Sequence, residues 1–176
     1  MNALTPDVIA HASPEAPPVA AAEAQSVAPL LVSGIEAVAR SRLLTVPASS
    51  LLVEVAGLLS SAQISVVVVC DAAGAPIGVI TETVLVRSLG LAQADFFTTA
   101  AGEVMTPGFV ACAPDDVLSD VLAKMHEQGL VHVLLIDPNN NLLGVVNARD
   151  GLRALLAAGN QEEALLRNYV MSVGYQ

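Results

Sequence analysis

The chain has 176 residues, of which 17 are acidic and 7 basic, so its formal charge is −10 at pH 7. The basic residues are scattered and form no cluster that could neutralise many phosphates, so we expect no nucleic-acid partner. Mean hydropathy is +0.64, yet the longest apolar runs, Val66–Cys70 and Val131–Ile136, fall far short of the roughly 18 residues of a membrane-spanning helix. We therefore predict a soluble protein that does not bind membranes.

The cysteines and histidines give no sign of a metal site or a disulfide framework. Cys70 and Cys112 lack CxxC spacing, and the three histidines form no ligand set with them. No basic residue precedes Arg40, so the beginning of the chain does not resemble a secretory signal, and a cytoplasmic location is expected. Because only 14% of the residues are charged, part of the apolar surface is expected to be covered by a second copy, giving a homodimer.

Residues 1–33 differ in composition from the rest of the chain. They contain nine alanines, five prolines, three acidic residues and no basic one. Such a segment buries too little apolar surface to offset its ordering entropy, so it is predicted to be a disordered tail. From Gly34 onward, apolar residues at helical spacing lead into a short predicted strand, Leu43–Val46.

An internal repeat organises residues 34–159. A shift of 66 residues, which brings Val66 onto His132, aligns the chain with itself. Turn residues, glycines and apolar positions then match without a gap. Matched positions include Asp71 with Asp137, Gly78 with Gly144 and Arg87 with Arg153. The sequence therefore predicts one motif at 34–90, a linker at 91–103, a second motif at 104–159, and a C-terminal helix and tail at 160–176.

Both copies have the same predicted order of elements, β-α-β-β-α. A short strand, Leu43–Val46 or Phe109–Cys112, precedes a polar helix start at Ser49–Ser50 or Asp115–Asp116. An amphipathic helix follows, then a buried strand, a turn and a second strand. The closing helices are predicted to begin at Thr81 and Asn147, the second ending at Gly159. The C-terminal segment then starts an acidic helix with Leu165, Leu166, Tyr169 and Val170 on one side, which is expected to dock on its own domain or on a second subunit.

Four segments in the second copy form an ordered pattern: Glu103–Pro107, Ala113–Asp116, His132–Asp137 and Leu143–Asp150. This set resembles the second motif of a cystathionine-β-synthase (CBS) domain pair, the Bateman module, and residues 38–90 resemble the first motif. The resemblance implies a fold of class α/β (α+β), in which two tandem motifs pack through their sheets. It also implies a non-catalytic regulatory module that dimerises and needs no cofactor.

In that family, the clefts between the motifs bind adenosyl ligands such as AMP, ADP, ATP or S-adenosylmethionine. This sequence departs from the family pattern, because Val68 and Leu134 replace the proline usual in the middle strand. The Ser/Thr-x-x-Asp ribose motif is Asn147-Ala-Arg-Asp150 in the second copy and Thr81-Glu-Thr-Val84 in the first. The degenerate first site also favours an alternative function, a ligand-free dimerisation or protein-interaction scaffold.

Asn147 and Asp150 are the main candidate ligand-binding residues. Their places at a helix start would be explained by capping alone, since Asn147 suits the N-cap and Asp150 favours the positive helix end. A carboxylate there can also accept two hydrogen bonds from a ribose diol, which is the role the resemblance implies. Enzymatic chemistry is not indicated, because no nucleophile with an adjacent base, GxSxG motif or phosphate-binding Gly-rich loop is present.

The remaining candidates are placed by family position, each with a structural alternative. His132 would lie near a ligand phosphate or be a half-buried histidine bonded to backbone. Arg149 would meet an anion at the helix start or be solvated. The adenine pocket would be lined by four residues that could instead belong to the core: Val145, Leu44, Ile64 and Ser65.

Overall fold

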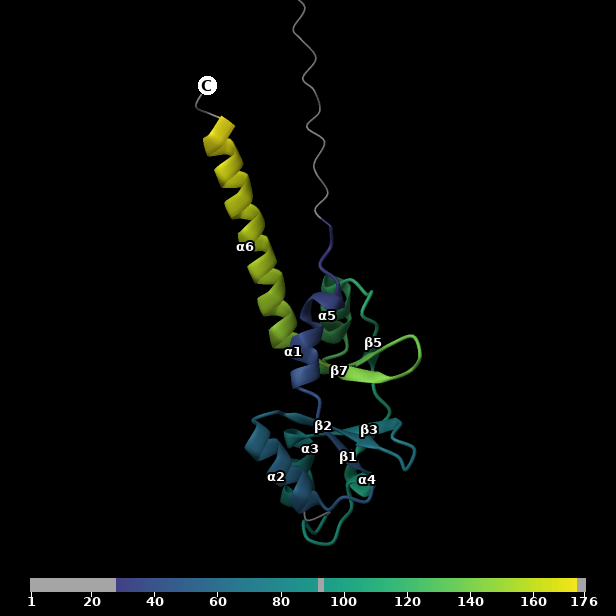
Figure 1. Ribbon diagram of the computed structural model, residues 1–176. Helices are drawn as coiled ribbons and strands as arrows, with labels where there is room; N and C mark the ends of the chain where they lie inside the picture. Colours follow the sequence, from purple (N-terminus) through teal and green to yellow (C-terminus); the bar gives the residue numbers. More distant parts are fainter. Residues whose placement is uncertain (1–27, 92–93, 174–176) are drawn as a thin grey trace, which may run out of the picture.

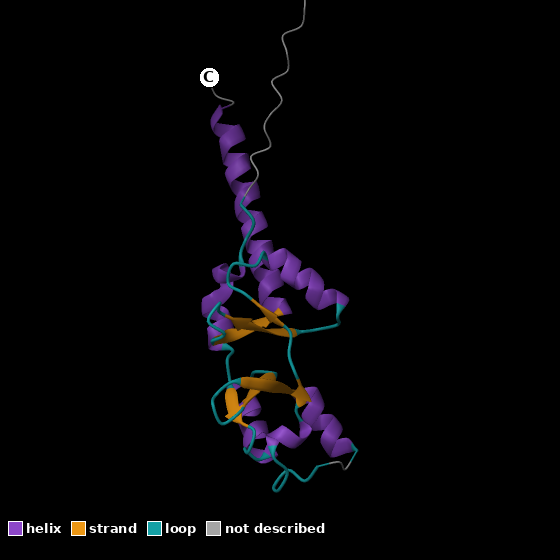
Figure 2. Ribbon diagram, turned by 90° about the vertical axis from the view of Figure 1, so that its right-hand side faces the viewer, coloured by secondary structure: helices purple, strands orange, loops and turns teal. Residues whose placement is uncertain are grey.

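The computed structural model describes residues 28–91 and 94–173. Two β-sheets face each other in the middle of the molecule, and helices cover their outer sides (Figures 1 and 2). The arrangement confirms the predicted mixed α/β fold with two tandem motifs packed through their sheets. In the described ranges no helix is both long and apolar enough to cross a membrane.

Each motif has the predicted β-α-β-β-α order. The first comprises β1 (Thr45–Pro47), α2 (Leu52–Ala62), β2 (Val66–Cys70), β3 (Pro76–Thr81) and α3 (Glu82–Gly90). The second comprises β5 (Ala111–Cys112), α5 (Leu118–Glu127), β6 (His132–Ile136), β7 (Leu142–Asn147) and α6 (Ala148–Val173). The segment leading into the first motif holds the 3-10 helix η1 (Val32–Ile35) and α1 (Glu36–Ser41), and that leading into the second holds α4 (Ala101–Val104) and β4 (Thr106–Pro107).

The two sheets have related topologies. In the order β1-β2-β3-β4, β1 is parallel to β2, whereas β3 is antiparallel to both of its neighbours. In the order β5-β6-β7, β5 is parallel to β6 and β6 is antiparallel to β7. The middle strands β2 and β6 are buried along most of their length, which explains why they are continuous apolar runs rather than alternating ones.

The 66-residue repeat extends to details of the backbone. The register between β2 and β3 shifts between Val69 and Cys70, and the register between β6 and β7 shifts at the corresponding place, between Leu135 and Ile136. Residues with left-handed φ also correspond, Gln63 (53°) with Gly129 (65°) and Gly74 (82°) with Asn140 (64°). Turns and strand irregularities are therefore repeated along with the hydrophobic pattern.

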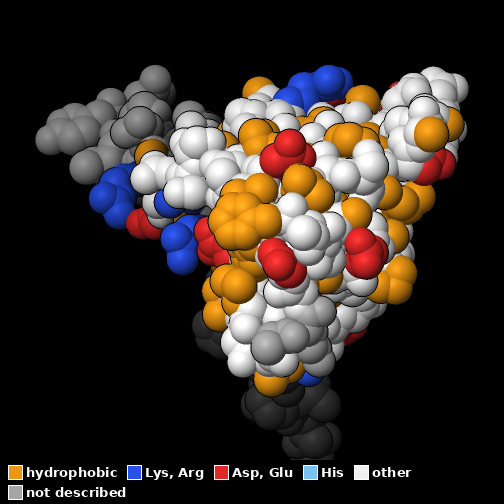
Figure 3. Space-filling view, turned by 90° about the horizontal axis from the view of Figure 1, so that it is seen from below, with side chains coloured by type: hydrophobic (Ala, Val, Ile, Leu, Met, Phe, Trp, Pro, Cys, Tyr) orange, Lys and Arg blue, Asp and Glu red, His pale blue; other side chains and the backbone are white. Residues whose placement is uncertain are grey.

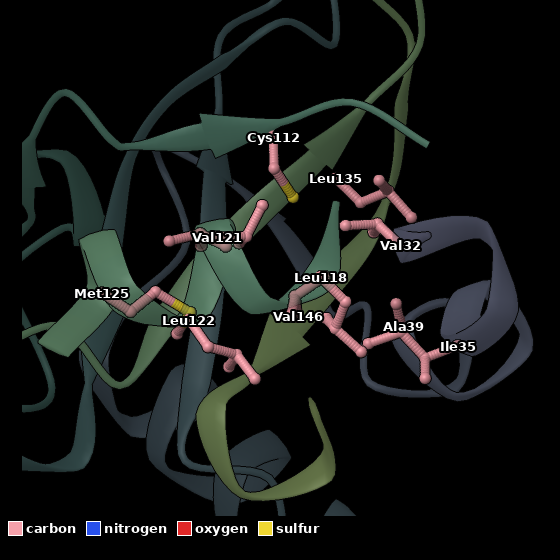
Figure 4. Close-up of a cluster of buried hydrophobic side chains, with 11 residues drawn as sticks. Val32, Ile35, Ala39, Cys112, Leu118, Val121, Leu122, Met125, Leu135 and Val146 are labelled. Atoms are coloured by element: carbon pink, nitrogen blue, oxygen red, sulfur yellow. The ribbon is translucent and has the colours of Figure 1, made fainter. Parts of the chain in front are cut away.

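Three apolar clusters hold the fold together. One lies between the two sheets and is formed by Ile64, Val66, Val68, Cys70, Leu134 and Val145. A second lies under α2 and α3 in the first motif. The third joins α5 and the second sheet to the chain before the first motif (Figure 4), and comprises Val32, Ile35, Ala39, Cys112, Leu118, Val121, Leu122, Met125, Val133, Leu135 and Val146.

The leading segments of the two motifs are exchanged. Although α1 precedes the first motif in sequence, it packs on β7 of the second motif. Conversely, α4 precedes the second motif and packs on β1 and β3 of the first, and β4 extends the first sheet through the pairs Gly78–Pro107 and Val79–Thr106. Each motif therefore completes the other, and the boundary between them in space does not follow their boundary in sequence.

The predicted caps of α2 and α5 are wrong, whereas the closing helices begin after Thr81 and Asn147 as predicted. Ser49–Ser50 and Asp115–Asp116 lie in the turns before the helices, whose N-caps are Leu51 and Val117. The backbone N–H of Leu51 is instead satisfied by Glu54 Oε2 at 3.0 Å, and Asp116 Oδ2 accepts a hydrogen bond from the backbone of Ala113 at 2.9 Å. The polar residues therefore shape the turns and do not cap the helices.

Two predicted boundaries also change. Residues 28–33 do not belong to a disordered tail, because Val32 is fully buried and its backbone N–H donates to Asp116 O at 2.9 Å. Helix α6 does not end at Gly159 but continues to Val173, so the predicted separate helix from 160 is its continuation. Residues 1–27, 92–93 and 174–176, and the side chains of the predicted stripe Leu165, Leu166, Tyr169 and Val170, lie outside what is described.

Candidate functional site

The repeat creates two comparable positions where a closing helix starts beside the other motif. The second-motif position is called the second cleft here because the repeat relates it to the hollow of the first motif. It is formed around the start of α6 and includes Arg42, Ser65, His132, Asn147 and Asp150. The first-motif position, the first cleft, is a hollow around the start of α3. It is lined by residues of both motifs, among them Thr81, Thr83, Phe109, Val110 and Val131, and Ser65 and His132 lie on its wall as well. The two positions differ in both shape and charge.

Asp150 is the central acidic group of the second cleft. It lies in the first turn of α6, only 8% exposed, and is one of two buried polar residues in the described part of the chain, the other being Ser88. Arg42 forms a bidentate ion pair with it, through an Nε–Oδ2 contact and an Nη2–Oδ1 hydrogen bond of 3.1 Å. Arg153 Nη1 lies 3.7 Å from Oδ1. Both carboxylate oxygens are therefore engaged by guanidinium groups.

His132 links the two motifs at the same place. Its Nε2 lies 3.0 Å from Ser65 Oγ of the first motif and 3.0 Å from Asn147 Nδ2 of the second. Asn147 Oδ1 accepts a hydrogen bond from the backbone N–H of Arg149 at 2.8 Å, so its amide nitrogen is assigned as the donor toward His132. Burial and then the positive charge of Arg42 lower the pKa of His132 below 6.5. The ring is therefore neutral at physiological pH and accepts at Nε2.

The structure brings together some of the predicted site residues and separates others. Asn147 and Ser65 both contact His132, and Asp150 lies three residues after Asn147 in the first turn of α6. The side chain of Arg149 is exposed, while its backbone contributes to the cap made by Asn147. The aliphatic candidates Val145, Ile64 and Leu44 belong to or pack against the apolar cluster between the sheets. A role in the core therefore accounts for the positions of these three residues, and their role in an adenine pocket stays a prediction.

The first cleft is an open hollow of about 690 Å³, within the usual size of a small-molecule site. Its walls combine the start of α3 with the chain around β4 and the loop before β6. Val84 occupies the position that Asp150 holds in the second cleft, and Gly108 occupies that of Arg42. The first cleft therefore has room for a ligand but lacks both members of the ion pair.

Arg42 is a site residue that sequence analysis did not identify. The ion pair joins positions 108 residues apart, and Arg42 precedes the first strand, outside the ribose motif. One signal in the sequence was the difference between the two copies at this position, because the shift aligns Arg42 with Gly108. That glycine has φ of +75°, whereas Arg42 is right-handed, so the repeat breaks down locally at this position.

The described residues contain no group of His, Cys, Asp and Glu side chains that could hold a metal ion. What the second cleft offers is an amide, a hydroxyl and a neutral imidazole in hydrogen-bonding range of one another, and a buried carboxylate in the first turn of α6 that is paired with Arg42. These groups suit recognition of hydroxyls and amines by hydrogen bonds.

A model of the CBS domain matches the chain twice, at residues 35–90 and 101–157. The chain belongs to the CBS-domain family. The two matches correspond to the two structural motifs, including the α1 residues that pack on the second motif and the α4 residues that pack on the first. CBS-domain pairs are generally regulatory modules rather than catalytic ones.

Solved structures of CBS-domain pairs share the fold. A CBS-domain-containing protein from Agrobacterium tumefaciens is 26% identical, with a TM-score of 0.64 over 74% of this chain and 96% of its own. The CBS domain pair of MJ0100, in complex with 5′-methylthioadenosine and S-adenosyl-L-methionine, is 20% identical, with a TM-score of 0.64 over 75% and 99%. CBSX2 from Arabidopsis thaliana, in complex with AMP, is 20% identical, with a TM-score of 0.58 over 68% and 92%.

Proposed function

We propose that this CBS-domain pair is a non-catalytic regulatory module that binds an adenosyl ligand in the second cleft. The observation that carries the proposal is the buried Asp150 carboxylate in the first turn of α6, three residues after Asn147, whose amide contacts His132. An ionised carboxylate can accept both hydroxyl protons of a ribose diol in charge-assisted hydrogen bonds. The adenosine part shared by the ligands of MJ0100 and CBSX2 supports this ligand class.

Chemistry favours the second cleft although the first is a clearly open hollow. A ribose in the first cleft would meet the isopropyl group of Val84 and lose hydrogen bonds to water without replacement, at about 1–3 kcal/mol per unsatisfied group. That penalty corresponds to roughly tenfold to hundredfold weaker binding. We therefore expect one tight adenosyl ligand per chain.

Calorimetric titration with AMP, ATP, S-adenosylmethionine and 5′-methylthioadenosine tests the proposal. Asp150→Ala should abolish tight binding, whereas Val84→Ala, the matched change in the first cleft, should leave it unchanged. Because Asp150→Ala also leaves Arg42 without its partner, the melting temperature and circular dichroism of each variant serve as folding controls. Equal affinity in the wild type and Asp150→Ala, with both folded, would contradict the proposal.

The pairing of Asp150 with Arg42 favours a second candidate function, a ligand-free interaction scaffold. In that case Asp150 would be a structural residue whose hydrogen-bonding capacity is met within the chain. A thermal-shift screen distinguishes the two functions, since a ligand that binds the native state raises stability by RT ln(1 + [L]/Kd). No shift with any adenosyl compound at millimolar concentration would favour the scaffold.

We also propose that a second copy of the chain is a partner. Apolar side chains are exposed on both closing helices, with Val86 and Leu156 each 69% exposed and Leu89 and Leu152 about half exposed. The repeat relates Val86 to Leu152, so α3 and α6 present corresponding positions. Light scattering should give the mass of a dimer, and Val86→Asp combined with Leu152→Asp should give a folded monomer. A wild-type monomer at micromolar concentrations would contradict this proposal.

The side of the first motif that faces away from the second motif offers a less suitable surface. Seen from that side, hydrophobic side chains are interspersed with acidic ones (Figure 3). A patch divided by like charges is a poorer candidate for self-association than the apolar positions of α3 and α6.

A further inference from the structure

The ion pair in the second cleft blocks the group that a ribose would need. Arg42 contacts both oxygens of Asp150, and Arg153 lies 3.7 Å from one of them. A carboxylate in this state has few acceptor positions left for a diol. A ribose can bind Asp150 in the proposed manner only if the guanidinium of Arg42 moves away from it.

The displaced guanidinium would need another partner. Arg42 is only one-third exposed, at 33%, and a cation that is partly withdrawn from water is costly without a counter-charge. His132 cannot supply that charge, because its ring is neutral and Arg42 is one of the causes of its lowered pKa. Arg42 is therefore close enough to His132 for its charge to act on the ring, and it also contacts Asp150. A negative group beside His132 would satisfy the cation.

The second cleft is also surrounded by more positive charge than the first. Arg42 and Arg153 pair with the single carboxylate of Asp150 in the second cleft, and the exposed Arg149 directly precedes Asp150 in the chain, although the net charge of the protein is −10. The repeat places Gly108, Thr83 and Arg87 at the corresponding positions of the first cleft, next to the acidic Glu82. The second cleft is therefore a local concentration of positive charge in an acidic protein, and it attracts anions.

We propose that Arg42 is the specificity-determining residue of the second cleft and makes it selective for phosphorylated adenosine. In the free protein Arg42 pairs with Asp150, and on binding it exchanges that carboxylate for the ligand's phosphate while the ribose takes its place. Neutral adenosine displaces the guanidinium without offering it a partner. S-adenosylmethionine, which carries a net positive charge, adds repulsion. This inference rests on the proposed function and narrows its ligand to an anionic nucleotide.

Titrations of AMP, adenosine and S-adenosylmethionine into the wild-type protein test the selectivity directly. AMP should bind about tenfold to hundredfold more tightly than adenosine, as expected for a charge-assisted hydrogen bond, and S-adenosylmethionine should bind more weakly than AMP. Adenosine or S-adenosylmethionine binding as tightly as AMP would overturn the proposal. This measurement does not depend on the folding of any variant.

Arg42→Met then identifies the residue responsible. It keeps an unbranched apolar side chain but removes the guanidinium and its charge, so AMP should bind more weakly, adenosine more tightly, and the ratio of their dissociation constants should approach unity. Arg40→Met is the matched control, because Arg40 is exposed and pairs with Glu36 on the surface of α1. Arg42→Lys should keep part of the preference for AMP, since it retains the charge without the bidentate geometry.

The outcomes separate this inference from the proposed function. If all three compounds bind with equal affinity and Asp150→Ala abolishes binding, the adenosyl site stands and the role of Arg42 is overturned. If a folded Arg42→Met keeps the wild-type ratio of affinities, the selectivity arises elsewhere and the role of Arg42 is again overturned. If neither the wild type nor Arg42→Met binds any adenosyl compound, both proposals fail.

Discussion

Gly144 of β7 lies directly against the backbone of Ala39 in α1. A Cβ atom on Gly144 would stand 2.6 Å from the carbonyl carbon of Ala39 and 2.7 Å from its oxygen, closer than non-bonded atoms can approach. The helix that leads into the first motif is therefore seated on the second sheet through a contact that only glycine permits. The repeat relates this position to Gly78, where a Cβ would stand 2.6 Å from Thr106 O of the other leading segment.

Gly144→Ala should destabilise the protein because neither partner backbone can retreat without moving a whole element. We expect a loss of about 1–3 kcal/mol, typical of overpacking, measured by urea unfolding. Gly57→Ala is the matched control, because Gly57 lies inside α2 with open space around its Cα, and it should stabilise by up to about 1 kcal/mol. Equal stability of wild type and Gly144→Ala would mean that α1 is not held on β7.

The chain before the first motif should contribute to stability from residue 28 onward. Val32 is fully buried, Leu118 N–H donates to Leu30 O at 2.9 Å, and Ser33 N–H donates to Pro114 O at 2.9 Å. A chain beginning at residue 34 should therefore melt at a lower temperature than one beginning at residue 28. Full burial of a valine alone contributes about 1.5–3 kcal/mol. Equal melting temperatures would restore the sequence-based boundary at residue 33.

The sequence predicts well those strands and helices whose apolar pattern follows directly from which of their faces are buried. Val66–Cys70 was predicted as a buried strand and forms β2 with the same bounds, since a strand covered on both faces must be apolar throughout. Most residues of the apolar face predicted for each of α2 and α5 are buried, whereas Leu58 is 37% exposed and Leu51 and Val117 are the N-caps; the buried ones are Leu52, Val55, Leu59, Leu118, Val121, Leu122 and Met125. Their spacing is a property of the local sequence and needs no knowledge of the neighbouring elements.

Features that depend on tertiary contacts or small energy differences were missed. Helix α6 continues through Gly159, where its end is predicted. A glycine inside a helix costs only about 1 kcal/mol, which is too little to end a helix whose flanking residues favour helical structure. Val32 lies in an alanine- and proline-rich segment, and only its contact with the second motif orders it. The partner of Asp150 was missed, because Arg42 is remote in sequence and its counterpart in the repeat is a glycine, Gly108, which has no side chain to suggest an ion pair.

The two cysteines should be protected from thiol reagents in the folded protein. Burial, with a smaller effect of Asp116, raises the pKa of Cys112 to about 11, and burial likewise raises the pKa of Cys70. At pH 8 only about one Cys112 thiol in a thousand would be ionised, and the thiolate is the reactive form. Ellman's reagent should therefore react slowly with the native protein and fully in urea. Rapid native labelling in Cys70→Ser, where Cys112 is the remaining cysteine, would show that the third apolar cluster opens readily.

Stability should fall on mild acidification because of His132. Burial, and secondarily the charge of Arg42, lower the pKa of this residue in the folded protein below the ordinary value of 6.5. At a pH between the native pKa of His132 and 6.5, the unfolded chain binds a proton at His132 and the native chain does not. The free energy of unfolding therefore decreases as the pH falls through 6.5 toward the native pKa, and it is insensitive to this residue above that range.

Urea unfolding of the wild type and His132→Gln at pH 7 and pH 5 measures this contribution. Glutamine can still bond to Ser65 and Asn147 but does not titrate, so the variant should lose less stability between the two pH values than the wild type does. His126→Gln is the matched control, because His126 is exposed on α5, and it should keep the wild-type pH dependence. The difference belongs to His132 rather than to carboxylates, because every carboxylate is present in all three proteins. An identical loss of stability in wild type and His132→Gln would mean that the ring gains a proton as easily in the cleft as in the unfolded chain, and that the cleft between the motifs is open to water at that point.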